Sequence, residues 1–223
     1  KSRHQEFLRQ KTMSKLFDLN IDIIDKKKFK SLYPIAKNKD VISGLYIPDD
    51  GQADPEILTK CISLAAKKEG VKIFEKCKLE KILKRENQIR GVKTDHGIIN
   101  CEYIVLCAGM WSRQIGEAAG VSIPLYPNEH FYMITEDYKN LPKTLPTFRD
   151  PDTYLYAREY HGKIMLGIFE PNAKIAFKKT GKVPNNFSFG EFKVDKTYIK
   201  MLHELASKRM PLLKDLKIEK YFS

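Results

Sequence analysis

The stretch Asn100–Gly120, NCEYIVLCAGMWSRQIGEAAG, constrains the fold more than any other part of the chain. Tyr103–Cys107 is a continuous apolar run, which is typical of a strand covered on both faces. Ala108 and Gly109 follow it, and two small residues let another group approach the backbone closely. Ligands of open α/β sheets bind beyond such strand ends. The pattern predicts a buried strand, a tight turn and a helix that Gly120 ends, although plain packing of strand on helix produces the same pattern.

The residues before this stretch predict more of a layered α/β unit. Asp54 and Pro55 are strong signals for the start of a helix, and Gly70 is a signal for its end. The predicted buried face of this helix consists of Ile57, Leu58, Cys61, Ile62 and Ala65. Residues 71–74 then read as a strand of a parallel layer, and 79–84, 89–94 and 97–101 as a small inserted meander.

The character of the chain changes after Gly120. Strands are indicated at 130–135, 154–158 and 163–169, joined by proline-rich segments, so we predict an antiparallel sheet. One last helix is predicted from Asp195 to a point before Pro211, with a buried face of Tyr198, Met201, Leu202, Leu205 and Ala206. Near the N-terminus, helices are predicted over 3–17 and from the capping Asp25 to a point before Pro34.

Composition excludes several classes of function. The net charge is +12, but most of the basic residues are lysines scattered through every predicted element, whereas nucleic-acid surfaces concentrate arginines and aromatics in one patch. The longest apolar run is far too short to span a bilayer. The four cysteines form no C-x-x-C pair, so we expect buried thiols, no disulfide, no metal site and a reducing, cytoplasmic setting.

Four motifs carry a resemblance to a known family. They are the segment GLYIPDDGQADP at 44–55, CAGMW at 107–111, PNEHFY at 127–132 and LPTFRDPD at 145–152. Their order and spacing resemble the dimethylglycine and sarcosine dehydrogenase group, which belongs to the amino-acid-oxidase-like superfamily of FAD-dependent amine oxidoreductases. The resemblance covers nearly the whole chain and is loosest in 1–40 and 175–223.

This resemblance implies an α/β fold, α+β overall, in which part of a glutathione-reductase-like Rossmann domain for FAD joins an antiparallel-sheet substrate domain. We accordingly assign 1–40 to the substrate domain, 41–120 to a partial FAD-binding domain and 121–223 to the substrate domain. The glycines never form a G-x-G, so the dinucleotide fingerprint is absent. In the family that fingerprint precedes the part matched here. We therefore expect a central fragment of a flavoenzyme that is inactive alone.

The activity implied is oxidative demethylation of an N-methylated glycine, with hydride transfer to FAD. The resemblance gives His130 and Tyr156 as the catalytic residues. Histidine titrates near neutrality, and the amine must be neutral when it is oxidised. A histidine satisfied by backbone in a sheet is the alternative for His130. Tyr154 is a rival to Tyr156, because period-2 alternation puts both on one side of a strand.

Other residues are assigned less sharply. For the flavin, the resemblance implies contacts from Leu79, Ala108, Gly109 and Trp111, the last of which could instead be a core anchor. Arg149 and Arg158 fit a carboxylate clamp, although salt bridges are the expected role for each. The turn Glu170-Pro171-Asn172 echoes a family Y-E-P-N motif whose role stays open.

The competing hypothesis is a non-catalytic, flavoprotein-like regulatory subunit of the same family. The expected partner of the enzyme is a small N-methyl amino acid, with no nucleic acid and no membrane. The resemblance also suggests a folate-binding domain C-terminal to this chain in a full-length protein. The sequence does not decide between dimethylglycine, sarcosine and a related amine.

Overall fold

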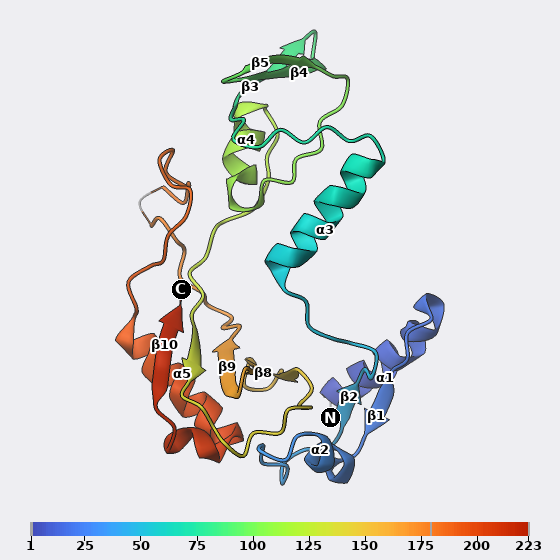
Figure 1. Ribbon diagram of the computed structural model, residues 1–223, viewed down its shortest axis with the longest axis vertical. Coiled ribbons are helices and arrows are strands. Elements are labelled where there is room, and N and C mark those ends of the chain that lie inside the picture. The colour runs from blue at the N-terminus through green and yellow to red at the C-terminus, as the bar shows by residue number, and fades with distance from the viewer. Residues whose placement is uncertain (1, 179, 223) are drawn as a thin grey trace. The chain divides into compact units, whose positions relative to one another are not determined.

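The computed structural model describes residues 2–178 and 180–222 (Figure 1), which divide into two compact units. The first unit contains residues 1–52, 130–173 and 191–223, and the second contains 53–129 and 174–190. These divisions differ from the boundaries at 40 and 120 assigned from the sequence. In both units, elements that are distant along the chain assemble together.

The first unit is built on a five-stranded antiparallel sheet. Its helices are α1 (Ser2–Ser14), α2 (Lys26–Leu32) and α5 (Lys196–Arg209), with 3₁₀ turns at Lys15–Phe17 and Pro211–Lys214. Its strands are β1 (Asp22–Ile24), β2 (Gly44–Tyr46), β6 (Tyr132–Thr135), β7 (Phe148–Asp150), β8 (Leu155–Tyr160), β9 (Lys163–Ile168) and β10 (Ile218–Phe222). The sheet order is β10-β6-β9-β8-β7, while β1 and β2 form a separate antiparallel pair. The predicted antiparallel sheet is therefore confirmed.

The core of the first unit lies between this sheet and the helices, and Figure 1 shows α5 running beside it. Strand residues Met133, Leu155 and Leu166 are fully buried, as is Leu202 of α5. Asp195 caps α5 by accepting bonds from the amides of Thr197 and Tyr198, as its residue type predicts. The predicted buried face of α5 is wrong at one position, since Met201 is exposed and Ile199 is buried instead.

The second unit contains a helix followed by a meander. Its elements are α3 (Pro55–Lys68), β3 (Leu79–Arg85), β4 (Gln88–Thr94), β5 (Gly97–Asn100), the 3₁₀ turn Gly109–Trp111 and α4 (Ser112–Ala118). The carboxylate of Asp54 caps α3 by accepting the Ile57 amide at 2.9 Å, as predicted. Strands β3, β4 and β5 pair in sequence order, which confirms the meander. Glu86 and Asn87 both have positive φ, which suits the tight β3–β4 hairpin.

Two predicted strands of the second unit are wrong. Residues 71–74 and 103–107 form no strand in the described part of the chain. Tyr103 and Val105 are each 85% exposed. A strand needs a hydrogen-bonded neighbour, and an apolar run specifies burial without specifying which segment supplies it. Among residues 2–178 and 180–222, no ladder pairs with either segment.

Burial in the second unit also differs from the sequence prediction. The apolar face expected to be buried on α3 is exposed, with Ile57 and Ile62 at 61% each. The cysteines are free thiols, and the prediction that they are buried is wrong: Cys61 and Cys107 are exposed, and Cys77 and Cys101 are intermediate. Apolar patterning thus located α3 correctly while overestimating what packs against it.

No helix within residues 2–178 and 180–222 combines the length and the apolar character needed to cross a bilayer.

Candidate active site

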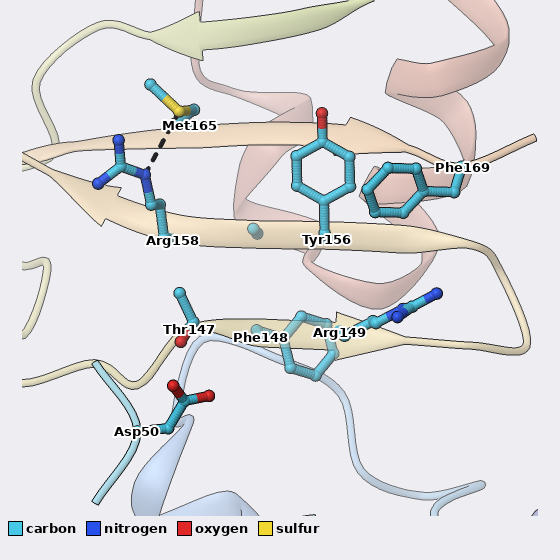
Figure 2. A pocket seen from close by; sticks show the side chains of 9 residues that line it. Asp50, Thr147, Phe148, Arg149, Tyr156, Arg158, Met165 and Phe169 are labelled. Carbon is cyan, nitrogen blue, oxygen red and sulfur yellow. Dashed lines mark hydrogen bonds between the residues drawn. The ribbon is translucent and has the colours of Figure 1, made fainter. Parts of the chain in front are cut away.

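A cavity of about 350 Å³ opens on the sheet of the first unit, on the strands β7, β8 and β9 (Figure 2). Its wall is mixed, with aromatic and thioether groups beside two guanidinium groups. The lining residues are Asp50, Thr147, Phe148, Arg149, Tyr156, Ala157, Arg158, Met165 and Phe169. A concave, largely apolar site with a few convergent polar groups is the usual form of a small-molecule site.

Tyr156, one of the two predicted catalytic residues, lies in this cavity. It pairs in register with Gly167 of the neighbouring strand β9, and its ring lies directly over that glycine. A Cβ built at Gly167 would overlap the phenol group of Tyr156. The ring also packs against Phe169, with 4.7 Å between centroids. A glycine opposite the tyrosine therefore makes the space in which the phenol lies.

The structure separates Tyr156 from its rival Tyr154. Tyr154 has a φ of 59°, precedes strand β8 and is exposed, and it does not line the cavity. The predicted placement of both tyrosines on one face is therefore wrong. Period-2 alternation applies only within a strand, and β8 begins at Leu155, after the turn.

The two guanidinium groups of the cavity have no carboxylate partner in the described part of the chain. Arg158 donates from Nη1 to Oε1 of Gln52 at 2.5 Å and from Nε to the sulfur of Met165 at 3.4 Å. Arg149 lies 5.4 Å from the ring centroid of Phe169. The salt bridges expected for these arginines are thus absent among the described residues, which leaves two positive charges available to an anionic ligand.

His130, the other predicted catalytic residue, lies just before strand β6 in the same unit. It does not line the cavity, but its ring meets Phe169 edge to face, with 6.2 Å between centroids. Phe169 therefore contacts the rings of both His130 and Tyr156. The His130 side chain is 46% exposed, and its Nδ1 lies 3.7 Å from the carboxylate of Glu170. Half of the imidazole is open to solvent or to a ligand.

Glu170 and Tyr198 complete the cluster around His130, and sequence reasoning did not assign either a role in the site. The Tyr198 hydroxyl, on α5, donates to Oε2 of Glu170 at 2.6 Å. The one sequence signal for Glu170 was its place in the E-P-N turn. There was none for Tyr198, which is 28 residues away and appears in the sequence only as a core position of an amphipathic helix.

The electrostatics of the cluster favour neutral phenol groups. Burial raises the pKa of Tyr156 above its usual value, and the nearby Tyr132 and Glu170 raise it further. Burial also raises the pKa of Tyr198 well beyond its usual range, and so does the hydrogen bond to Glu170. Both phenols therefore remain protonated donors at neutral pH.

The residues assigned to FAD lie in the second unit. Gly109 has a φ of 51°, and nothing lies within 4 Å of a Cβ built on it, so the backbone there is open to a large group. Trp111 is only partly buried, and its ring is 6.4 Å from that of Phe187. Leu79 begins strand β3 opposite Thr94. Open backbone at 109 and a half-covered indole fit a flat cofactor, whereas a core anchor would be fully covered.

A second cluster of ligating groups lies in the meander. Cys77, Asp95 and His96 bring one ligand atom each to within 4.8 Å of one another, although the sequence predicted no metal site. The Asp95 carboxylate already accepts the Lys78 amide at 2.9 Å and lies 2.7 Å from the His96 ring nitrogen. The hydrogen bond to His96 and that to Lys78 hold the pKa of Asp95 below its usual value.

Comparison with known proteins shows to which family the chain belongs. Residues 3–223 match the family model described as FAD dependent oxidoreductase. The chain is 33% identical over 202 residues to the mitochondrial pyruvate dehydrogenase phosphatase regulatory subunit of Mus musculus, covering 89% of this chain and 23% of that protein. It is 30% identical over 216 residues to the mitochondrial sarcosine dehydrogenase of Mus musculus, covering 95% and 23%. The chain thus spans about a quarter of the length of these relatives.

A solved structure of an oxidoreductase shares the fold of this chain. The crystal structure of L-proline dehydrogenase from P. horikoshii matches with a TM-score of 0.79 at 25% sequence identity. The match covers 99% of this chain and 56% of that protein. Because the family model covers almost the whole sequence and a solved oxidoreductase shares the fold, the chain belongs to the family of FAD-dependent oxidoreductases.

Proposed function

We propose that this chain is the substrate-binding part of an FAD-dependent enzyme that demethylates an N-methylated glycine oxidatively. The observation that carries the proposal is the cavity in which Tyr156 lies beside two arginines without carboxylate partners. Arginine's planar fork matches the two oxygens of a substrate carboxylate. The apolar surface of Met165 and Phe169 suits N-methyl groups.

Each residue of the site has a separate role in the proposed reaction. Arg158 and Arg149 bind the carboxylate, and the neutral phenol of Tyr156 donates a hydrogen bond to the substrate. His130 accepts the proton of the substrate ammonium, so that the amine lone pair is free when the C–N carbon is oxidised. When bound, FAD would supply the acceptor for the hydride that leaves the N-methyl carbon. Water then adds to the resulting iminium ion, which releases formaldehyde and the demethylated amine.

Gly109 and Trp111 are the residues that would contact the flavin nucleotide, the first through its open backbone and the second through its ring. Leu79 and Ala108 are assigned to the same role by the sequence motif. These assignments and the substrate assignment are proposals about the protein that contains this chain.

The test uses the FAD-loaded holoenzyme and a panel of sarcosine, dimethylglycine and proline. Flavin bleaching is followed anaerobically for wild type, His130→Gln, Tyr156→Phe and Arg158→Met. We expect His130→Gln to lower kcat/KM about 100-fold and Tyr156→Phe about tenfold, as for one lost hydrogen bond. Arg158→Met should raise KM at least tenfold for every substrate that carries a carboxylate.

The matched control is His161→Asn. His161 lies in the turn between β8 and β9 of the same unit with a φ of 51°, a conformation that asparagine tolerates. It should leave kcat/KM unchanged. If no N-methyl amino acid bleaches the flavin, or if His130→Gln behaves like the control, the catalytic proposal is wrong.

A second candidate is a non-catalytic regulatory subunit. The observation that favours it is the 33% identity to the pyruvate dehydrogenase phosphatase regulatory subunit. A holoenzyme that binds FAD stoichiometrically but is not reduced by any amine of the panel would support this second function. Turnover with any of them would eliminate it.

A further inference from the structure

We propose that Glu170, held by Tyr198, is a positioning residue that fixes the tautomer of His130. In the neutral imidazole it keeps the proton on Nδ1 and leaves Nε2 as the basic nitrogen. The role of Nε2 as a catalytic base rests on the proposed function, whereas the tautomer itself can be tested without it. Glu170 lies just after strand β9, His130 just before β6, and Tyr198 on α5, so three separate elements meet here.

The first step is the burial of the carboxylate. The Glu170 side chain is only 11% exposed, and an unpartnered buried carboxylate is costly. Its Oε2 accepts the Tyr198 hydroxyl at 2.6 Å, which is the length of a strong hydrogen bond to a charged acceptor. The same oxygen is 3.7 Å from Nδ1 of His130. One carboxylate oxygen therefore serves a fixed donor and faces a histidine nitrogen.

The second step is the rigidity of the donor. Tyr198 is 8% exposed and its ring packs on Phe131, with 5.0 Å between centroids. Its own amide donates to Asp195 at the start of α5. A phenol anchored at both its backbone and its ring cannot follow a moving carboxylate. Tyr198 therefore fixes where the Glu170 oxygen lies.

The third step is the orientation of the imidazole. The Phe169 ring meets His130 edge to face, which restrains rotation of the imidazole about its own axis. With Nδ1 at 3.7 Å from a carboxylate oxygen, the neutral ring is most stable with its proton on that nitrogen, because a carboxylate only accepts. Nε2 then carries the lone pair. In the proposed reaction this is the atom that takes the proton from the substrate ammonium.

The test reads the tautomer directly by ¹⁵N–¹H correlation of the histidine side chains in the 223-residue chain, at about pH 9, where imidazoles are neutral. The spectrum of His130→Gln assigns the signal. His203 is an internal reference of the opposite kind, since its Nε2 lies 2.9 Å from the Leu213 carbonyl and must donate to it. We expect His130 to show the Nδ1–H pattern and His203 the Nε2–H pattern.

The decisive variant is Glu170→Gln, whose amide oxygen can still accept the Tyr198 hydroxyl. It should convert most of the His130 signal to the Nε2–H form, and Tyr198→Phe should shift it in the same direction. The matched control Glu219→Gln, which removes an ion pair with Lys163 in the same unit, should leave it unchanged. Should Glu170→Gln fail to fold, Tyr198→Phe still decides the question. An Nε2–H pattern in wild type, or an unchanged signal in the variants, would overturn the proposal.

Kinetics of the FAD-loaded enzyme then separate this inference from the proposed function. Glu170→Gln should lower kcat/KM about tenfold while leaving KM nearly unchanged, because the carboxylate does not touch substrate. If His130→Gln impairs turnover and Glu170→Gln does not, the positioning role is wrong and the function stands. If neither impairs turnover while the tautomer is as expected, the positioning holds and the catalytic role of His130 is wrong.

Discussion

Gly167→Ala offers the sharpest test of how the cavity is built. Gly167 is buried in strand β9, between Tyr132 of β6 and Tyr156 of β8 in register. Its φ is not in the left-handed region, so the backbone itself accepts alanine. The new methyl group would overlap the phenol oxygen and the adjoining ring atoms of Tyr156. The substitution therefore acts on the site through one identified collision.

The magnitude follows from which atoms collide. They belong to the far end of a side chain that can rotate, so the strand need not separate from its neighbour. Overpacking of cores costs about 1–3 kcal/mol, and Tyr156 is only partly buried, so we expect a loss near 1 kcal/mol in the free energy of unfolding. The displaced phenol would leave the cavity. The kcat/KM of the holoenzyme should then fall at least as far as in Tyr156→Phe.

The assay is urea unfolding of the 223-residue chain followed by circular dichroism, with Tyr156→Ala and the double variant completing a cycle. Once the ring is gone, Gly167→Ala should cost nothing further, so the two effects should not add. Gly51→Ala is the control, because nothing lies within 4 Å of a Cβ there, and it should stabilise by about 0.4–1 kcal/mol. Additive effects of Gly167→Ala and Tyr156→Ala would refute the collision.

Three further predictions follow from other contacts. Arg209→Met should lower the free energy of unfolding by about 3–5 kcal/mol in urea titrations, because it leaves the carboxylate of Asp150 buried without its ion pair. Hydrogen bonding to Arg209 lowers the pKa of the exposed Asp40, so the stability from this pair is present above the unfolded pKa and lost as the pH falls below about 4. Asp40→Asn should flatten that part of the Tm–pH curve. Trp111→Ala in the holoenzyme should lower flavin occupancy as well as Tm. A lower Tm with full flavin occupancy would show that Trp111 only packs against Phe187 and does not contact the flavin.

Local signals in the sequence predicted local structure well. Asp54 was predicted as a helix cap and Asp195 as the start of a helix, and both accept the amide hydrogen bonds that caps accept. The meander was predicted because its turns and strands are neighbours along the chain. The antiparallel sheet was predicted for β6, β8 and β9, which are long enough to show a pattern. Strands β7 and β10 were missed, the first because three residues carry no periodicity.

What the sequence could not supply was the identity of contacts between distant segments. It placed Tyr156 and His130 in the same region by motif, and the structure joins them through Phe169, which no periodicity indicates. The alternation pattern did not distinguish Tyr154 from Tyr156, because it does not reveal that Tyr154 has a left-handed backbone conformation before the strand begins. The partners of Glu170 required the fold, since Tyr198 approaches it from helix α5, 28 residues further along the chain.

The segment Tyr103–Cys107 has a consequence for the protein in solution. It presents apolar side chains together with backbone amides that no ladder within the described residues satisfies. Such a segment is a template on which another copy can add a strand. The net charge of +12 opposes that encounter through repulsion between like-charged molecules, and added salt screens the repulsion. Dilute, low-salt buffer should therefore keep the isolated chain dispersed, while physiological salt brings copies together at this segment.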